Sequence, residues 1–83
     1  MNHSSKERLI FLLIEIVEGR ISLQDVAQEI GAFENIKSNT VVATACHQLR
    51  HFDTDADIRA RDQTYDMLMR KNMYDYIEKI RNS

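Results

Sequence analysis

Residues 9–17 read Leu-Ile-Phe-Leu-Leu-Ile-Glu-Ile-Val and form the longest apolar stretch of the chain. Its apolar side chains recur three and four residues apart, the period of one face of an α-helix, and further apolar residues widen that face. A membrane span needs about 20 apolar residues, so this stretch is too short to cross a bilayer. The sequence therefore predicts that residues 9–17 belong to the most buried, central helix of a soluble helical bundle.

Start and stop signals flank this stretch. Ser4, with a glutamate three residues later, makes a capping box that would begin the first helix, and Gly19 can supply the left-handed residue that ends it. Ser22, with an aspartate three residues later, repeats the box for a short second helix that Gly31 is expected to end. Two helices joined by a short turn are therefore expected in the first part of the chain.

Residues 32–38 are predicted to be a linker in which Phe33 and Ile36 insert into the core. A third helix is expected to start near Ser38 or Asn39. Its apolar residues follow the helical spacing of three, four and three. They are Val42, Ala45, Leu49 and Phe52.

The next segment, residues 53–66, contains five aspartates and two arginines. Thr54 with Asp57 makes a weak capping box, and the apolar pattern falters between residues 59 and 64. We therefore expect a short helix at 54–61 that bends into a final helix from about 64 to 81. The apolar stripe of this part comprises Ile58, Tyr65, Leu68, Met69, Met73, Tyr76, Ile77 and Ile80.

The 83 residues contain no proline, and no alternating strand pattern survives between turn signals. We expect an all-α fold, a small antiparallel bundle of four to five helices in one domain spanning 1–83, with residues 1–3 as a disordered tail. Cys46 is the only cysteine, which fits a small apolar role and a cytoplasmic location. The broad apolar face of the first helix suits either a monomer or a homodimer.

Charge is distributed unevenly along the chain. The formal net charge is −2, to which residues 53–66 contribute −3 (two Arg against five Asp) and residues 67–83 contribute +2 (four Lys/Arg against two Asp/Glu). Acids suit helix N-termini and bases suit C-termini, so a solvated helix start explains much of this pattern. An acidic docking face for a basic partner, with a tyrosine as anchor, explains it equally well. The candidate partner-binding residues are Asp53, Asp55, Asp57, Asp62, Tyr65 and Asp66.

Residues 22–31 also resemble the first helix and turn of a helix-turn-helix DNA-binding motif. The turn in that motif has three or four residues, whereas the next apolar helix begins seven or eight residues after Gly31. The second helix would carry little basic charge, with Lys37 before it and Arg50 at its far end. A small DNA-binding or regulatory domain is therefore the alternative interpretation, and nucleic acid is not the partner we favour.

Residues with metal-binding or catalytic potential are few. His47 and His51 are spaced i, i+4, but a zinc site needs a third and usually a fourth ligand, so we expect two partly exposed histidines and no metal. Catalysis by paired carboxylates needs a pKa raised by burial, and aspartates beside Arg59 and Arg61 are expected to stay ionised. We therefore expect neither enzymatic activity nor a cofactor.

Three stretches resemble the colicin D immunity family and related small colicin-like self-protection proteins. The first is residues 13–22, an apolar helix that runs into Gly-Arg-Ile-Ser, and the second is the aromatic and acidic step at residues 52–57. The third is Tyr65-Asp66 with the amphipathic segment 67–81. Together these stretches cover most of residues 9–81.

This resemblance implies a small helical bundle that binds a secreted ribonuclease toxin in the cytoplasm of the producing cell. Acidic groups of such proteins cover the positively charged, RNA-binding active site of the toxin. The resemblance gives this role to Asp53, Asp55 and Asp57, with Asp62 and Asp66 beside them. Thr54 departs from the family pattern, where proline is common. We expect a non-catalytic interaction protein, and more specifically a toxin immunity protein.

Overall fold

A computed structural model describes residues 3–35 and 40–83 of the chain, and these residues form helices and no strand. The predicted all-α class is therefore confirmed. None of the helices in the described parts is long and apolar enough to span a membrane. The elements are α1 (His3–Val17), the 3₁₀ turn η1 (Leu23–Val26), α2 (Ala27–Glu34), α3 (Thr40–Thr54), α4 (Ala56–Arg61) and α5 (Gln63–Arg81).

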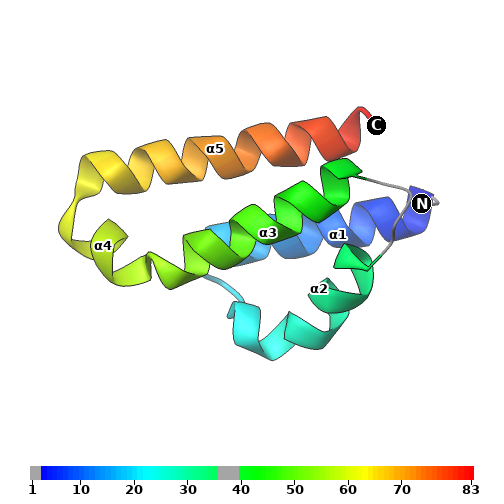
Figure 1. Cartoon of the computed structure of the whole chain (residues 1–83), viewed down its shortest axis with the longest axis horizontal. Helices are drawn as coiled ribbons and strands as arrows, with labels where there is room; N and C mark the ends of the chain where they lie inside the picture. The colour runs from blue at the N-terminus through cyan, green and yellow to red at the C-terminus, as the bar shows by residue number, and fades with distance from the viewer. Residues whose placement is uncertain (1–2, 36–39) are drawn as a thin grey trace.

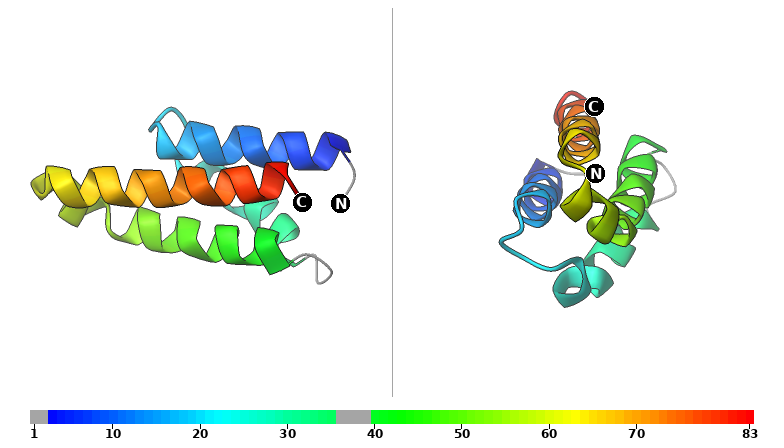
Figure 2. Two further views of the ribbon diagram at one scale, coloured as in Figure 1. Left: turned by 90° about the horizontal axis from the view of Figure 1, so that it is seen from above. Right: turned by 90° about the vertical axis from the view of Figure 1, so that its left-hand side faces the viewer.

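The long helices form an up-and-down bundle (Figure 1). Helices α1 and α3 run in one direction, and α2 and α5 run back in the other. Helix α5 packs against both α1 and α3, while α2 packs against α3 on the far side of the bundle (Figure 2). The short helix α4 closes the end at which α3 is joined to α5. The radius of gyration, 12.3 Å, is close to the roughly 12 Å expected for a compact chain of this length.

Helix α1 supplies more buried residues than any other described helix, as its apolar sequence predicts. It is not buried all round, however, because the side chain of Phe11 is 48% exposed. The core contains no buried polar or charged residue among those described. Its members are Leu9, Ile10, Leu12, Leu13, Ile16, Val17, Leu23, Ile30, Val42, Ala45, Cys46, Leu49, Phe52, Met73, Ile77 and Ile80.

Several predicted boundaries are confirmed. Gly19 has a φ of +78° and ends the α1 segment, and Arg20 donates its backbone N–H to the carbonyl of Glu15 across that turn. The Ser22 hydroxyl accepts from the backbone N–H of Gln24 at 3.2 Å and caps η1 as predicted, although the second α-helix itself begins later, at Ala27. The expected bend lies at Asp62, where an extended backbone separates α4 from α5. Strong local signals therefore located these boundaries correctly.

Other boundaries were predicted wrongly. Helix α1 already includes His3, so Ser4 is not its cap and His3 is not part of a disordered tail; residues 1 and 2 lie outside the described residues. Gly31 lies inside α2, which continues to Glu34, because a glycine with ordinary helical φ need not end a helix. Residues 32–34, which were predicted to belong to the linker, therefore belong to α2.

The remaining differences concern the segment after α2. Phe33 packs partly buried against the core as predicted, whereas the expected insertion of Ile36 and the start near Ser38 or Asn39 lie outside the described residues. Helix α3 runs through Thr54, whose hydroxyl donates back to the Arg50 carbonyl at 2.9 Å and so does not cap the next helix. The predicted capping box at Thr54 is wrong.

Three members of the predicted apolar stripe are neither in the core nor packed against it, namely Ile58, Leu68 and the half-buried Tyr65. The side chains of Ile58 on α4 and Leu68 on α5 are 42% and 52% exposed. Helix α4 buries none of its residues, so Ile58 has no core to enter. Leu68 lies on the side of α5 that faces away from α1 and α3, whereas Met73, Ile77 and Ile80 face inwards as predicted. Apolar character alone therefore overstated the buried surface at this end of the bundle.

Candidate functional site

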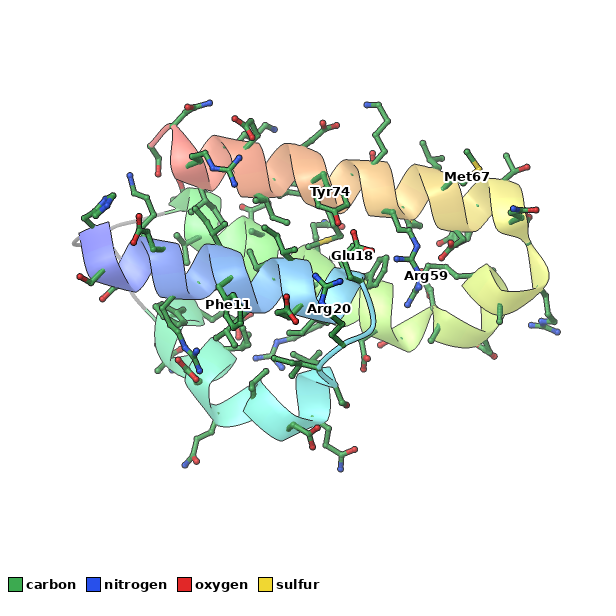
Figure 3. The ribbon with its side chains drawn as sticks, turned by 180° about the vertical axis from the view of Figure 1, so that it is seen from behind. Phe11, Glu18, Arg20, Arg59, Met67 and Tyr74 are labelled. Atoms are coloured by element: carbon green, nitrogen blue, oxygen red, sulfur yellow. The ribbon has the colours of Figure 1, made fainter. Side chains whose placement is uncertain are left out.

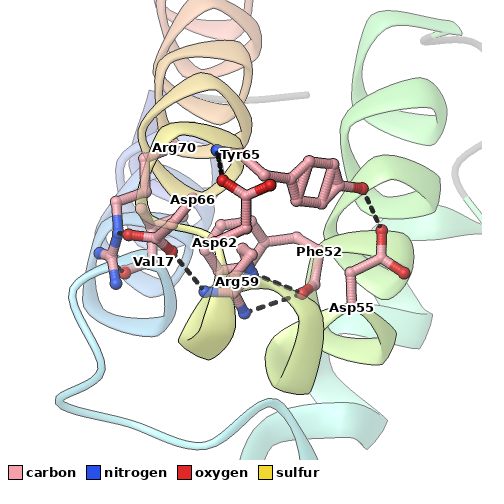
Figure 4. A network of polar contacts seen from close by, with 8 residues as sticks. All are labelled: Val17, Phe52, Asp55, Arg59, Asp62, Tyr65, Asp66 and Arg70. Atoms are coloured by element: carbon pink, nitrogen blue, oxygen red, sulfur yellow. Dashed lines mark hydrogen bonds and ion pairs between the residues drawn. The ribbon is translucent and has the colours of Figure 1, made fainter.

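The acidic segment 53–66 lies where α3, α4 and α5 meet, and an arginine occupies its centre (Figure 4). The side chain of Arg59 is only 11% exposed. Its Nε and Nη2 atoms both donate to the carbonyl oxygen of Phe52, at 3.1 and 2.8 Å. Its guanidinium also lies 3.5 Å from the centre of the Phe52 ring.

This contact closes the C-terminal end of α3. The last carbonyls of a helix have no partner within the helix and need another donor. The carbonyl of His51 is satisfied by the backbone N–H of Asp55, and the carbonyl of Phe52 is satisfied by Arg59. A cation at this end also interacts favourably with the helix dipole. Arg59 therefore joins α4 to the end of α3.

Asp66, near the start of α5, pairs with Arg59 and with a second arginine. Arg59 Nη1 lies 3.1 Å from one carboxylate oxygen of Asp66, and Arg70 Nε lies 2.9 Å from the other. Arg70 also donates through Nη1 to the carbonyl of Val17, the last residue of α1. Asp66 thus links two arginines, each of which caps the C-terminal end of another helix. We call Arg59, Asp66 and Arg70 the arginine clamp.

The clamp holds the pKa of Asp66 below its ordinary value of 3.8, chiefly through the hydrogen bond from Arg70 and then through Arg59. A carboxyl group with a lowered folded-state pKa stabilises the protein above its ordinary pKa. That contribution is lost as the pH falls through the lowered folded-state pKa. Asp66 is therefore ionised, as predicted, but its carboxylate is engaged by arginines and is not turned to solvent.

We expect Asp66→Asn to be less stable than the native protein at pH 7, with the difference narrowing once the pH falls below about 4. Urea denaturation at a series of pH values between about 7 and 2 measures this difference, and the contributions of the other acids cancel in it. In an Arg70→Gln background the same substitution should produce a smaller difference, because Arg70 is the main cause of the shift. A difference that stays constant with pH would contradict this role of the clamp.

Two further predicted binding residues also have partners within the fold. The Tyr65 hydroxyl donates to Oδ2 of Asp55 at 2.7 Å and ties α5 to the connection before α4. This hydrogen bond to the Asp55 carboxylate stabilises the protonated phenol and so raises the pKa of Tyr65. Asp62 accepts the backbone N–H of Tyr65 at 3.0 Å and is the N-cap of α5. Asp62 fits the known preference for aspartate at this position.

Asp53 and Asp57 are exposed, as the helix cap Asp62 is, but they make no strong contact within the described part of the fold. Asp57 faces Arg61 at 4.0 Å, and the two side chains are 80% and 76% exposed, so this pair contributes little to stability. Asp53 is exposed near the end of α3 and has no ion pair within the described parts of the chain. Of the six predicted site residues, four therefore have firm partners within the fold, namely Asp55, Asp62, Tyr65 and Asp66. Asp53 and Asp57 have no strong partner among the described residues.

Arg59 and Arg70 are the functionally placed residues that the sequence analysis missed. The sequence identifies Arg59 only as a base beside the aspartates, whereas the structure turns it inwards. A signal for Arg70 was present, because Asp66 and Arg70 are spaced i, i+4, the spacing of helical ion pairs. For Arg59 no local signal exists, since its main partner is a carbonyl on the preceding helix.

The other sequence candidates have distinct surroundings. Cys46 is fully buried, and this burial raises the pKa of its thiol to about 11, which keeps it protonated. Arg50 forms a two-point contact with Glu34 on α2, with its Nη2 atom 2.7 Å from a carboxylate oxygen, so its charge is neutralised. Helix α3 also directs Val42 and Leu49 into the core, and the geometry gives α3 little basic surface for a DNA groove.

No family model matches the chain, and no curated protein or solved structure matches it either. The resemblance to the colicin D immunity family therefore rests on the sequence motifs alone.

Proposed function

We propose that this protein is a non-catalytic interaction protein that docks the acidic end of its bundle onto a basic partner. The surface in question lies around α4 and comprises the outward carboxylates of Asp53, Asp57 and Asp62 with the half-buried Asp55. We call it the α4 surface. Clustered acids of this kind steer a basic protein and set its orientation on docking.

The observation that carries the proposal is the inward position of Arg59. Arg59 is one of two cations within residues 53–66, and its guanidinium is placed against Phe52 and Asp66. Arg59 and Asp66 pair inwards and cancel, so the outward charge of the segment is −3, with four aspartates set against Arg61 alone. Carboxylates of this surface suit paired contacts with arginines of a partner, which are the strong kind of charged hydrogen bond.

Exposed apolar side chains lie at the same end of the molecule. Ile58 is on α4, and Met67 and Leu68 are near the start of α5, with Met67 65% exposed (Figure 3). Interfaces place apolar and aromatic groups at their centre and charged groups at the rim. The combination of acidic and apolar groups supports docking better than a purely solvated helix start does.

In its more specific form the proposal names the partner as a nuclease toxin of the colicin type, in line with the resemblance of the sequence motifs. A nuclease cleft is cationic because it binds RNA phosphates, and carboxylates of the α4 surface would take the place of those phosphates. The protein would then block substrate binding by occupying the cleft and would need no catalytic group of its own.

The test is capture of the partner from the source cells with the native protein and with Asp53→Lys/Asp57→Lys as baits. Both substituted side chains are exposed, so the variant is expected to fold, which circular dichroism checks. We expect the native bait to retain a basic protein, to lose it as salt rises, and to inhibit its nuclease activity. The charge-reversed bait should bind it at least tenfold more weakly.

A matched control reverses two acids elsewhere on the surface. Asp75→Lys/Glu78→Lys changes the charge by the same amount on α5, where both side chains are more than half exposed. The control should retain the partner almost as well as the native bait. Equal losses in both variants would show a general charge effect and would contradict a docking site at α4.

A further inference from the structure

Two histidines lie one helical turn apart on the exposed side of α3, and their rings are in direct contact. The Nε2 atoms of His47 and His51 are 3.2 Å apart. The rings meet edge to face, with 4.7 Å between their centroids and 77° between their planes. This pair lies outside the arginine clamp and the α4 surface, and neither uses it.

The backbone under this pair is fixed by its neighbours. Cys46 and Leu49 are fully buried on the opposite side of α3, and Arg50 joins the helix to Glu34 on α2. The separation of the two Cα atoms is therefore set by the helix, while the exposed rings can turn about χ2, a broad torsion for histidine. A rigid helix backbone that carries two rotatable imidazole rings suits the chelation of one metal ion.

The spacing of the two nitrogens fits a metal ion. Zinc–nitrogen bonds are about 2.0–2.1 Å, so two nitrogens on a tetrahedral zinc stand about 3.3–3.4 Å apart. Nitrogens at right angles on a copper or nickel ion stand about 2.8–3.0 Å apart, given similar bond lengths. The 3.2 Å between His47 and His51 lies between these values.

We propose that His47 and His51 form a two-imidazole chelate for a divalent transition-metal cation such as Zn²⁺ or Cu²⁺, with water in the remaining coordination positions. Imidazole is a preferred ligand of these ions. The proposal revises the expectation from the sequence, which required a third protein ligand.

No third ligand is supplied by the described parts of the chain, where no three His, Cys, Asp or Glu groups are arranged to share a metal. Glu34 is the acid that interacts with His47, but its carboxylate is held by Arg50. The open positions therefore go to water, and the bound ion stays exchangeable.

Binding of the metal ion also determines which tautomer each imidazole adopts. In the metal-free pair one ring must carry its proton on Nε2 in order to donate to the other ring. Both rings bind the ion through Nε2, so that proton moves to Nδ1 of the same ring, with water as the carrier. Each imidazole stays neutral, and no net proton is released.

The experiment uses the whole chain without an affinity tag, in a His3→Gln background that removes the other histidine. Calorimetry with Zn²⁺ alone, at mildly alkaline pH where imidazole is neutral, should give one ion per chain. His47→Gln and His51→Gln should each weaken binding by about tenfold or more, since even losses of indirect partners of a metal ligand cost this much. With Cu²⁺, electron paramagnetic resonance should show two bound nitrogens, and one in either variant.

A control separates chelation from the number of histidines. His51→Gln/Lys71→His keeps two imidazoles but places one on α5, at a side chain that is 71% exposed. It should bind zinc as weakly as His51→Gln. Binding that is unchanged in the single variants, or restored in this control, would overturn the proposal. Circular dichroism of the metal-free variants checks that the exposed substitutions leave the helices intact.

Discussion

Arg59→Ala is expected to lower the free energy of unfolding by about 3 kcal/mol, the low end of the range found when one partner of a buried ion pair is removed, because this pair is part-buried. The substitution leaves the Phe52 carbonyl without its donor and removes one of the two arginines from Asp66. It also exposes the face of the Phe52 ring that the guanidinium covers. Urea denaturation measures the loss, and the melting temperature should fall by roughly 10–20 °C.

Arg61→Ala is the matched control for this prediction. It removes the same kind of side chain two residues away. Arg61, however, is 76% exposed, and its ion pair with Asp57 is long, at 4.0 Å. Its expected effect is below about 0.5 kcal/mol, as for most exposed ion pairs. Arg59→Lys should fall between the two, because lysine keeps the charge and loses the fork of donors. Equal effects of the two alanine substitutions would contradict a structural role for Arg59.

Leu13→Ala is the second change with a large expected effect, a loss of about 3 kcal/mol. Leu13 has no exposed surface and lies on α1, which packs against α5. Truncation loses the transfer free energy of the removed carbons and leaves a cavity that neighbouring side chains fill only in part. A chain of 83 residues has a small core, so this loss is a large share of its total stability.

Leu68→Ala provides the comparison, since it makes the same chemical change at a side chain that is 52% exposed. Its expected effect on the free energy of unfolding is below about 1 kcal/mol. Both losses are measured by urea denaturation. The slope of the unfolding free energy against urea concentration shows whether a substitution changes the compactness of the denatured state. Comparable losses at the two leucines would mean that Leu68 is covered in solution, for example by a second copy of the chain.

The break before α5 shows how far local signals reach. The apolar pattern falters at residues 59–64, and the structure has its break at Asp62, within that interval. The sequence does not reveal the capping residue itself, because Asp62 stands among the acids of the candidate docking face. Capping depends on only three or four neighbouring residues, so such signals can be read from sequence once the helix start is known.

The acidic segment shows the opposite case. Its aspartates look alike in sequence, yet Asp66 is held by two arginines while Asp53 is turned to solvent. The difference arises from which elements meet at this end of the bundle. Arg70, for example, donates to the carbonyl of Val17, 53 residues earlier in the chain. No window of local sequence contains both partners.

The sequence by itself therefore determined the helical class, the buried face of α1, the turn at Gly19 and the bend near Asp62. Each depends on residues within one or two helical turns, through apolar periodicity, capping or backbone freedom. Only the tertiary structure decided which charges are engaged, that Arg59 points inwards, and that Ile58 and Leu68 stay exposed. Those outcomes depend on which helix ends come together, because the carbonyls of Phe52 and Val17 take their donors from other helices, 7 and 53 residues along the chain.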